Sequence, residues 1–208
     1  MELLEALIPE ESGANMQLAD PYLLQTYKLL EERTIWVDTE IDESLLNVTR
    51  QIMLWNMEDQ DIKVEDRIPI KICIFSPGGN LAETMHACSV MQMSKTPVYT
   101  YNMGTAMSGG VMLLIAGHKG HRYTLPYARA MAHQGSGMIG GTAGQAKDAM
   151  DDYQAQINDM INFIIDNTNI TKQQFSKKKD RDWYMGAEDM VKYGVVDHIV
   201  TNISEIIG

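Results

Sequence analysis

Two spacings of apolar residues alternate along the chain. Between residues 20 and 200, short runs that are apolar almost throughout alternate with longer stretches in which apolar residues recur every three or four positions. The first pattern is typical of strands buried on both faces, and the second is typical of amphipathic helices. The alternation predicts an α/β fold with a largely parallel, buried sheet.

The predicted elements can be placed by residue number. Strands are expected at 34–37, 68–75, 98–103, 123–125, 128–133 and 195–200. Helices are expected at 21–33, 41–57, 81–93, 111–116, 145–167 and 187–193. The helix at 145–167 would be roughly 33 Å long at about 1.5 Å per residue, which is more than a small domain needs for its own core.

The segments outside these elements differ in character. Residues 1–20 follow neither spacing and are expected to form an N-terminal arm, which leaves 21–208 as one folded domain. The polar stretch 58–67 is expected to be a loop, and five glycines in 135–144 predict a flexible loop there.

Composition narrows the classes of function. The 208 residues include 17 Lys plus Arg and 28 Asp plus Glu, a formal net charge of -11, which argues against a nucleic-acid partner or an anionic membrane surface. Two cysteines cannot build a disulfide framework, and no apolar run approaches the roughly 20 residues that span a bilayer. The acidic first residues do not resemble a secretory signal. We therefore expect a cytoplasmic protein.

Two loops follow expected strands, at 76–79 and 104–110, and such loops commonly carry the functional groups of α/β folds. Ser108 lies among small residues before a helix, where its hydroxyl could be exposed and the amide of Gly109 could bind an oxyanion. A plain serine N-cap is an equally good interpretation of Ser108. Gly78 and Gly79 could aim a second amide at the same anion, although a tight turn alone also explains them.

A nucleophilic serine needs a base and an acid that orients it. Of the five histidines, His133 has the setting of a site, because it ends an apolar strand just before the glycine-rich loop. Asp182 lies in a charged segment beside Trp183 and is the candidate acid; a solvated turn is the alternative. Among the other histidines, His86 is expected to be packed in a helical stripe and His198 to be structural. His118 and His121 form an H-x-x-H pair, but no Cys or carboxylate cluster lies near them in the sequence, so no metal site is expected there.

Six motifs occur in one order along the chain. They are LLEERTIW at 29–36, SPGG at 76–79, GTAMSGGVMLLIAG at 104–117, AHQ at 132–134, DRDWYMGA at 180–187 and YGVVD at 193–197. Together they resemble the ClpP family, the proteolytic subunits of the ATP-dependent caseinolytic protease, and the resemblance covers residues 27 to 200.

The resemblance implies a fold and a set of site residues. The fold would be ClpP/crotonase-like, with stacked β-sheets flanked by helices and a protruding helical handle at about 134–167. Ser108 would be the nucleophile, His133 the base and Asp182 its orienting acid, with the amides of Gly79 and Gly109 forming the oxyanion hole. No metal or cofactor would be needed in the subunit itself. The residues that would bind substrate are Gly78, Asn80, Leu81, Gly135 and Ser136.

The resemblance also implies a function. The chain would be a serine endopeptidase subunit of stacked heptameric rings that degrade unfolded polypeptides, in the cytoplasm or in an organelle stroma or matrix. ATP would enter only through an AAA+ unfoldase. Lys71 and Cys73 take positions where the family has aromatic side chains that help to dock the unfoldase, so weak docking of a standard unfoldase is expected.

Two other functions remain open at this point. A catalytically silent ring subunit would share the fold and assemble with active partners, and the unusual segment 135–144 could misalign its site. An acyl-CoA enzyme of the related crotonase fold would share the oxyanion amides but would have no serine nucleophile, which the presence of Ser108, His133 and Asp182 disfavours.

Overall fold

The computed structural model describes residues 20–135, 137–178 and 181–207. The chain divides into two units, residues 1–32 and 33–208, and each is considered by itself. Apart from Asp20, the expected N-terminal arm lies outside the described residues. Helix α2 (Pro21–Glu31) belongs to the first unit, and its N-cap is Asp20, whose side chain accepts the amide N–H of Tyr22 at 2.9 Å.

The second unit is built on a mixed sheet that has seven strands in the described part of the chain. The strands are β1 (Thr34–Val37), β2 (Ile70–Ser76), β3 (Val98–Met107), β4 (Arg122–Thr124), β5 (Arg129–Ala132), β6 (Trp183–Met185) and β7 (His198–Ile199). Their order is β1-β2-β3-β4-β7, and every pair along this path is parallel. The second half of β3 pairs in parallel with β5, and β5 pairs with β6 in the antiparallel sense. The predicted α/β fold with a parallel sheet is confirmed.

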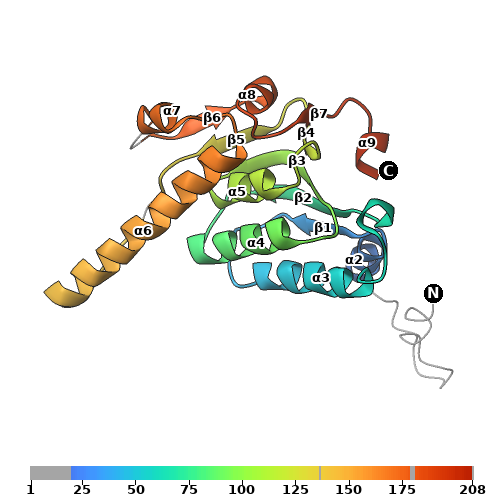
Figure 1. The fold of residues 1–208 in the computed structure, drawn as a ribbon, viewed down its shortest axis with the longest axis horizontal. Helices are drawn as coiled ribbons and strands as arrows, with labels where there is room; N and C mark the ends of the chain where they lie inside the picture. Colours follow the sequence, from blue (N-terminus) through green and yellow to red (C-terminus); the bar gives the residue numbers. More distant parts are fainter. Residues whose placement is uncertain (1–19, 136, 179–180, 208) are drawn as a thin grey trace, which may run out of the picture. The chain divides into compact units, whose positions relative to one another are not determined.

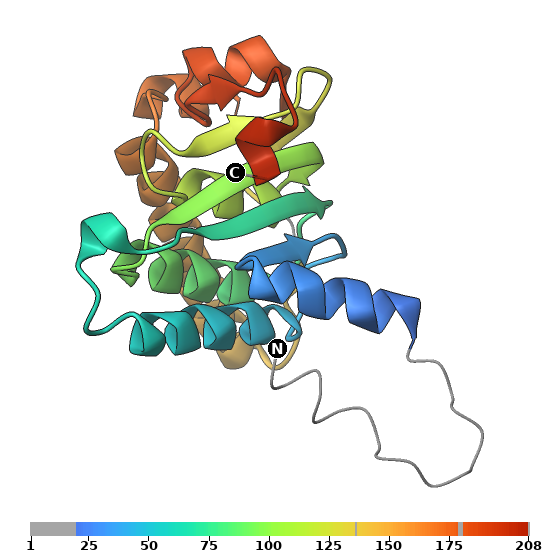
Figure 2. The same cartoon turned by 90° about the vertical axis from the view of Figure 1, so that its right-hand side faces the viewer.

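Three helices cover one face of the sheet: α3 (Leu45–Glu58), α4 (Leu81–Met93) and α5 (Gly109–Ala116) (Figures 1 and 2). All eight residues of α5 are buried, because this apolar helix lies between the sheet and α4. On β2, Ile70, Ile72 and Ile74 are fully buried on one face of the strand, which explains the isoleucine at every second position up to the buried Ser76.

The opposite face of β2 and β3 packs against the end of the chain. Cys73, Tyr101, Val200 and Ile206 form a buried cluster there, with partly buried aromatic and aliphatic side chains around it. Ile206 comes from the short helix α9 (Ser204–Ile207), and the Nζ of Lys71 donates to the carbonyl of Ile207 at 3.0 Å.

Helix α6 (Ala143–Asn167) is the longest helix of the described residues and has 25 residues. A capping box between Thr142 and Gln145 fixes its start. Its buried residues, Ile157, Met160 and Ile164, all lie in the second half, and Figure 1 shows the first half running out past the helical layer. This is the segment that was expected to form the handle.

Several element boundaries differ from the predictions. The helix expected at 41–57 begins only at Leu45, because Ile41 forms a bridge with Gly79 instead. The last strand shortens to β7 because the amide of Val195 donates to the carbonyl of Met190 in a turn. Four short elements were not predicted: η1 (Val64–Asp66), α7 (Lys172–Ser176), β6 and α9. Helix α8 (Ala187–Lys192) was predicted almost to the residue. Over the described residues, no helix combines the length and the apolar character needed to cross a lipid bilayer.

Candidate active site

Ser108 lies at the sharp turn between β3 and α5. Its φ of 51° and ψ of -118° are unusual for a residue with a side chain, so the turn is strained. The Ser108 amide donates to the carbonyl of Met131 on β5 at 2.8 Å, which holds the turn against that strand. The hydroxyl makes no capping bond to α5. The interpretation of Ser108 as a plain N-cap is therefore wrong.

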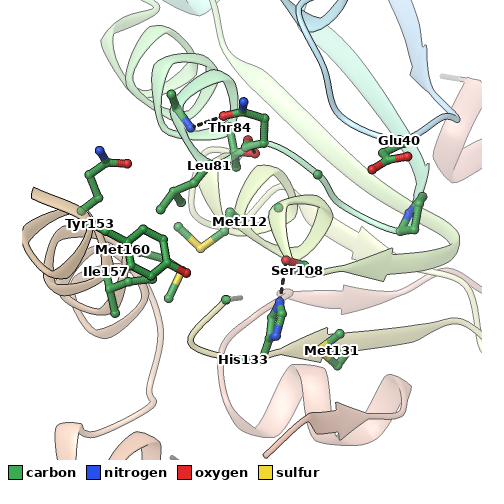
Figure 3. A pocket seen from close by; sticks show the side chains of 17 residues that line it. Glu40, Leu81, Thr84, Ser108, Met112, Met131, His133, Tyr153, Ile157 and Met160 are labelled. Carbon is green, nitrogen blue, oxygen red and sulfur yellow. Dashed lines mark hydrogen bonds between the residues drawn. The ribbon is translucent and has the colours of Figure 1, made fainter. Parts of the chain in front are cut away.

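His133 faces Ser108 from the end of β5. The pairing of Met107 with Met131 places the residues that follow each strand side by side. Nε2 of His133 lies 2.8 Å from Oγ of Ser108, so the hydroxyl can donate to the neutral imidazole (Figure 3). This is the geometry that a general base needs before it removes a hydroxyl proton.

Asp182 approaches the other ring nitrogen of His133 from the position just before β6. Ala132 pairs with Trp183, so one further step along the same antiparallel register sets Asp182 opposite His133. Oδ1 of Asp182 lies 3.9 Å from Nδ1 of His133, within ion-pair range for a protonated imidazole but beyond a hydrogen bond. The Asp182 side chain is 50 % exposed, and its Oδ2 accepts a hydrogen bond from the hydroxyl of Tyr184 at 3.2 Å.

Gly78, Gly79 and Gly109 are closely packed: Gly78 lies against the turn at Ser108, Gly79 against the backbone of Ile41, and Gly109 against the side chains of Thr84 and Ile41. A Cβ on Gly78 would lie 2.7 Å from Cβ of Ser108, and a Cβ on Gly109 would lie 2.6 Å from Oγ1 of Thr84. Gly109 is the first residue of α5, and amides in the first turn of a helix have no acceptor within that helix. The bridge to Ile41 uses the carbonyl of Gly78 and the amide of Asn80, so the Gly79 amide takes no part in it. The two amides proposed from the sequence are thus suited to bind an anion.

A cavity of about 560 Å³ opens next to Ser108. Ser108 and His133 lie at one side of it, and Gly79 and Gly109 are also among its lining residues (Figure 3). The apolar wall is formed by side chains from α4, α5 and α6: Leu81, Met112, Tyr153, Ile157 and Met160. Such a cavity can hold a large apolar side chain next to a reactive serine.

The residues expected to bind substrate are placed as follows. Asn80, Leu81 and Gly135 line the cavity, and Gly78 lies behind Ser108. Asn80 also caps α4, because its side chain accepts the amide N–H of Ala82 at 2.8 Å. Ser136 lies outside the described residues.

Apart from Leu81, the side chains of the apolar wall were not predicted from the sequence, and neither was the contact of Tyr184 with Asp182. Tyr153, Ile157 and Met160 follow helical spacing on α6, and this periodicity could have identified a face. It could not have shown that the face meets Ser108. Tyr184 is two residues from Asp182 on a strand that was not predicted, so nothing marked the two side chains as neighbours.

The remaining histidines lie elsewhere. Nδ1 of His118 accepts the amide N–H of Val98 at 3.0 Å, and burial lowers the pKa of this imidazole. Nε2 of His198 lies 3.1 Å from the carbonyl of Gly120. The prediction that His86 is packed was wrong, because His86 is exposed on α4, although its Nε2 lies 3.2 Å from Oγ1 of Thr49. Where the structure describes the chain, no three side chains of His, Cys, Asp or Glu are grouped so as to hold a metal ion.

Several known proteins are similar to this chain over most of its length. The family model for Clp protease matches residues 20–203. The ATP-dependent Clp protease proteolytic subunit 2 of Rhodococcus jostii is 36 % identical over 179 residues, which cover 86 % of this chain and 89 % of the relative. Subunit 2 of Corynebacterium glutamicum is 37 % identical over 175 residues, 84 % of each chain. Subunit 1 of Chlamydia felis is 31 % identical over 198 residues, 95 % of this chain and 93 % of the relative.

Proposed function

This chain belongs to the Clp protease family, and from that premise we propose that it is a serine endopeptidase subunit with Ser108, His133 and Asp182 as its catalytic triad. The observation that carries the proposal is the 2.8 Å contact between Nε2 of His133 and Oγ of Ser108, at the mouth of a cavity with an apolar wall.

The proposed reaction is acyl transfer in two steps. Ser108 attacks a peptide carbonyl while His133 takes the hydroxyl proton, and Asp182 stabilises the imidazolium. The amides of Gly79 and Gly109 hold the oxyanion, and one such donor contributes on the order of 10²–10³ in rate. His133 then protonates the departing amine, and water, with its proton taken by His133, hydrolyses the acyl-enzyme. The apolar wall favours substrates with a large apolar side chain before the cleaved bond.

The assembly forms part of the same proposal. Relatives are named as proteolytic subunits of ATP-dependent Clp proteases, which supports a complex with an ATPase. We propose stacked heptameric rings of this chain that admit unfolded polypeptides and receive ATP-driven force from an AAA+ unfoldase. A ring chamber would restrain the peptidase, because a folded protein is too large to reach Ser108. The proposed location is the cytoplasm, or an organelle stroma or matrix.

A second candidate is a catalytically silent ring subunit. One observation favours it: the 3.9 Å separation between His133 and Asp182 is longer than a hydrogen bond, and the carboxylate is half exposed. In apo enzymes, however, catalytic hydrogen bonds are often long and tighten when substrate binds. The acyl-CoA enzyme of the crotonase fold has no such support, because the chain belongs to the Clp protease family.

Covalent labelling separates the two candidates. The wild-type chain, Ser108→Ala and Ser89→Ala would be incubated with a fluorophosphonate probe, after their assembly has been checked by analytical ultracentrifugation. Ser89 is an exposed serine of α4 and serves as the matched control. We expect labelling of the wild type and of Ser89→Ala, and none of Ser108→Ala. Folded, assembled wild-type rings that remain unlabelled would establish the silent subunit instead.

A further inference from the structure

Asp182, just before β6, and Tyr184, on β6, lie on the same side of this segment. Successive side chains of a strand point to opposite faces, so residues two apart lie on the same face. Trp183, between them, points inward, is 7 % exposed and meets Tyr193 edge to face at a centroid distance of 4.9 Å. This anchor fixes the strand so that Asp182 and Tyr184 both project from its other side.

The backbone of Tyr184 is also close to the triad in the pairing of β5 with β6. It pairs with Met131 of β5, whose carbonyl accepts the amide N–H of Ser108. Asp182 lies opposite His133 in the same register. The Tyr184 backbone is therefore tied to the strand that carries the base and that holds the nucleophile turn, and any shift of β6 moves both side chains together.

The hydroxyl of Tyr184 holds one oxygen of the Asp182 carboxylate. It donates to Oδ2 at 3.2 Å, while Oδ1 faces Nδ1 of His133. The terminal torsion of an aspartate is broad, so a half-exposed carboxylate turns freely unless one oxygen is held. Fixing Oδ2 leaves Oδ1 as the oxygen that meets the imidazole. Arg181 is the charged side chain beside this pair, in a second cavity of about 300 Å³ that it shares with His133 and Asp182.

We propose that Tyr184 is a positioning residue, which orients the carboxylate of Asp182 toward His133 by its hydroxyl bond to Oδ2. This inference rests on the proposed function of the triad. The negative charge of Asp182 raises the pKa of the Tyr184 phenol, as does their hydrogen bond, so the hydroxyl remains a donor throughout the neutral range. A hydrogen bond to a charged group, exposed as this one is, supports an effect of about three- to tenfold.

The test is Tyr184→Phe, which removes the hydroxyl and keeps the ring. With a fluorogenic peptide we expect kcat to fall about three- to tenfold, with KM unchanged. Tyr127→Phe is the control, since Tyr127 is a fully exposed tyrosine in the turn before β5. Thermal unfolding and ultracentrifugation establish that each variant is folded and assembled.

A double-mutant cycle shows whether Tyr184 acts through Asp182. Rates of fluorophosphonate labelling would be measured for the wild type, Tyr184→Phe, Asp182→Asn and the double variant. We expect Tyr184→Phe to slow the wild type and to leave Asp182→Asn unchanged, because no carboxylate remains to be oriented. An active wild type that Tyr184→Phe does not slow, or an equal loss in both backgrounds, overturns this inference alone. A wild type without Ser108-dependent labelling overturns the proposed function and this inference with it.

Discussion

At Ser108 the backbone holds a conformation that costs about 1–3 kcal/mol in a residue with a side chain. The hydrogen bond from the Ser108 amide to Met131 and the burial of all residues of α5 offset the cost of this strained backbone. It turns the hydroxyl away from the helix that it would otherwise cap and toward His133. Gly78 makes room for this turn, with a φ of +93° and its Cα against Ser108.

Gly78→Ala should therefore disable the site. A Cβ there would lie 2.6–2.7 Å from Met107, Ser108 and Gly109, in a backbone conformation that L-residues rarely adopt. We expect a fluorophosphonate to label Ser108 at least about 100-fold more slowly in this variant. This is the size of effect that the loss of one oxyanion donor has on the rate. Gly140→Ala is the control, since nothing lies within 4 Å of the place that its methyl group would take, and its rate should equal that of the wild type. Equal rates for both variants would contradict the steric argument.

The sequence predicted the polar residues of the site better than its apolar ones. Ser108, His133 and Asp182 each stand in a short motif, and the order of the motifs is specific. The structure brings the three together, and their catalytic role stays a prediction. Tyr153 and Met160 stand in no motif, because a cavity wall needs only apolar bulk, which many residue types supply. Their place follows from how α6 meets α5, which is a tertiary property.

Among the elements, those with strong local patterns were predicted well. α4 was predicted at 81–93 and observed there, since Asn80 caps its start and neither glycine nor proline interrupts it. β6 has three residues and depends on β5 for its hydrogen bonds, so no local signal could reveal it. α9 is also set by its packing, because Ile206 inserts into the cluster around Cys73 and Tyr101. Short elements are stabilised by tertiary contacts rather than by propensity.

Within α6, Gly144→Ala should stabilise the protein. Gly144 lies in the first turn, nothing lies within 4 Å of an added Cβ, and alanine loses less backbone entropy on folding. We expect the free energy of unfolding in urea to rise by about 0.5–1 kcal/mol. Gly120→Ala is the contrasting variant: its surroundings are equally open, but its φ of +88° disfavours alanine, so this variant should lose stability. A loss of stability in Gly144→Ala would show that the start of α6 is not limited by helix propensity.

Across the second unit as a whole, two ion pairs tie distant segments together. Asp59, which is 1 % exposed, accepts hydrogen bonds from Arg33 at 2.7 Å and from Thr96. Asp197 accepts from Nη2 of Arg122 at 2.7 Å and from backbone amides. The hydrogen bond from Arg33 lowers the pKa of Asp59; burial alone would raise the pKa of Asp197, but the bonds from Arg122 outweigh it and lower that pKa as well.

Stability should consequently fall in acid. Both carboxyls have pKa values below their ordinary value of about 3.9, so their contribution is present above that pH and is lost as the pH falls through the folded-state values. Urea unfolding at pH 7, 4 and 3 would measure this loss. We expect Asp59→Asn to cost about 3–5 kcal/mol at pH 7, since it leaves Arg33 with only the exposed carboxylate of Glu58, 3.8 Å away, in place of a buried, hydrogen-bonded one, and to flatten the acid dependence. Asp61→Asn, at an exposed position, should behave as the wild type. If the wild type and both variants lost stability equally in acid, groups other than Asp59 would be responsible for that loss.

The face of the sheet that carries Lys71 and Cys73 bears on how an unfoldase would dock. The resemblance to the family places Lys71 and Cys73 where aromatic side chains are expected. Lys71 donates to the carbonyl of Ile207 on α9, and Cys73 is buried in the cluster that contains Ile206. Because α9 packs on this face of the sheet over Cys73 and Tyr101, we expect a standard AAA+ unfoldase to bind the assembled rings weakly, as measured by biolayer interferometry. Ile206→Ala should loosen α9 and strengthen binding several-fold. Tight binding of the wild-type rings would contradict the prediction.

The pairing of β5 with β6 sets a time at which the proposed enzyme can first act. His133 and Asp182 lie on opposite strands of this pair, and the whole of α6 and α7 is synthesised between them. Closing so long a loop is slow compared with forming a helix, and β6 has no stability of its own. At about 5–20 residues per second, a nascent chain on the ribosome would thus carry its nucleophile and base for roughly 2–10 s before the acid is synthesised. The peptidase would remain inactive until the last part of the chain has folded, which protects the chain itself while it is still extended.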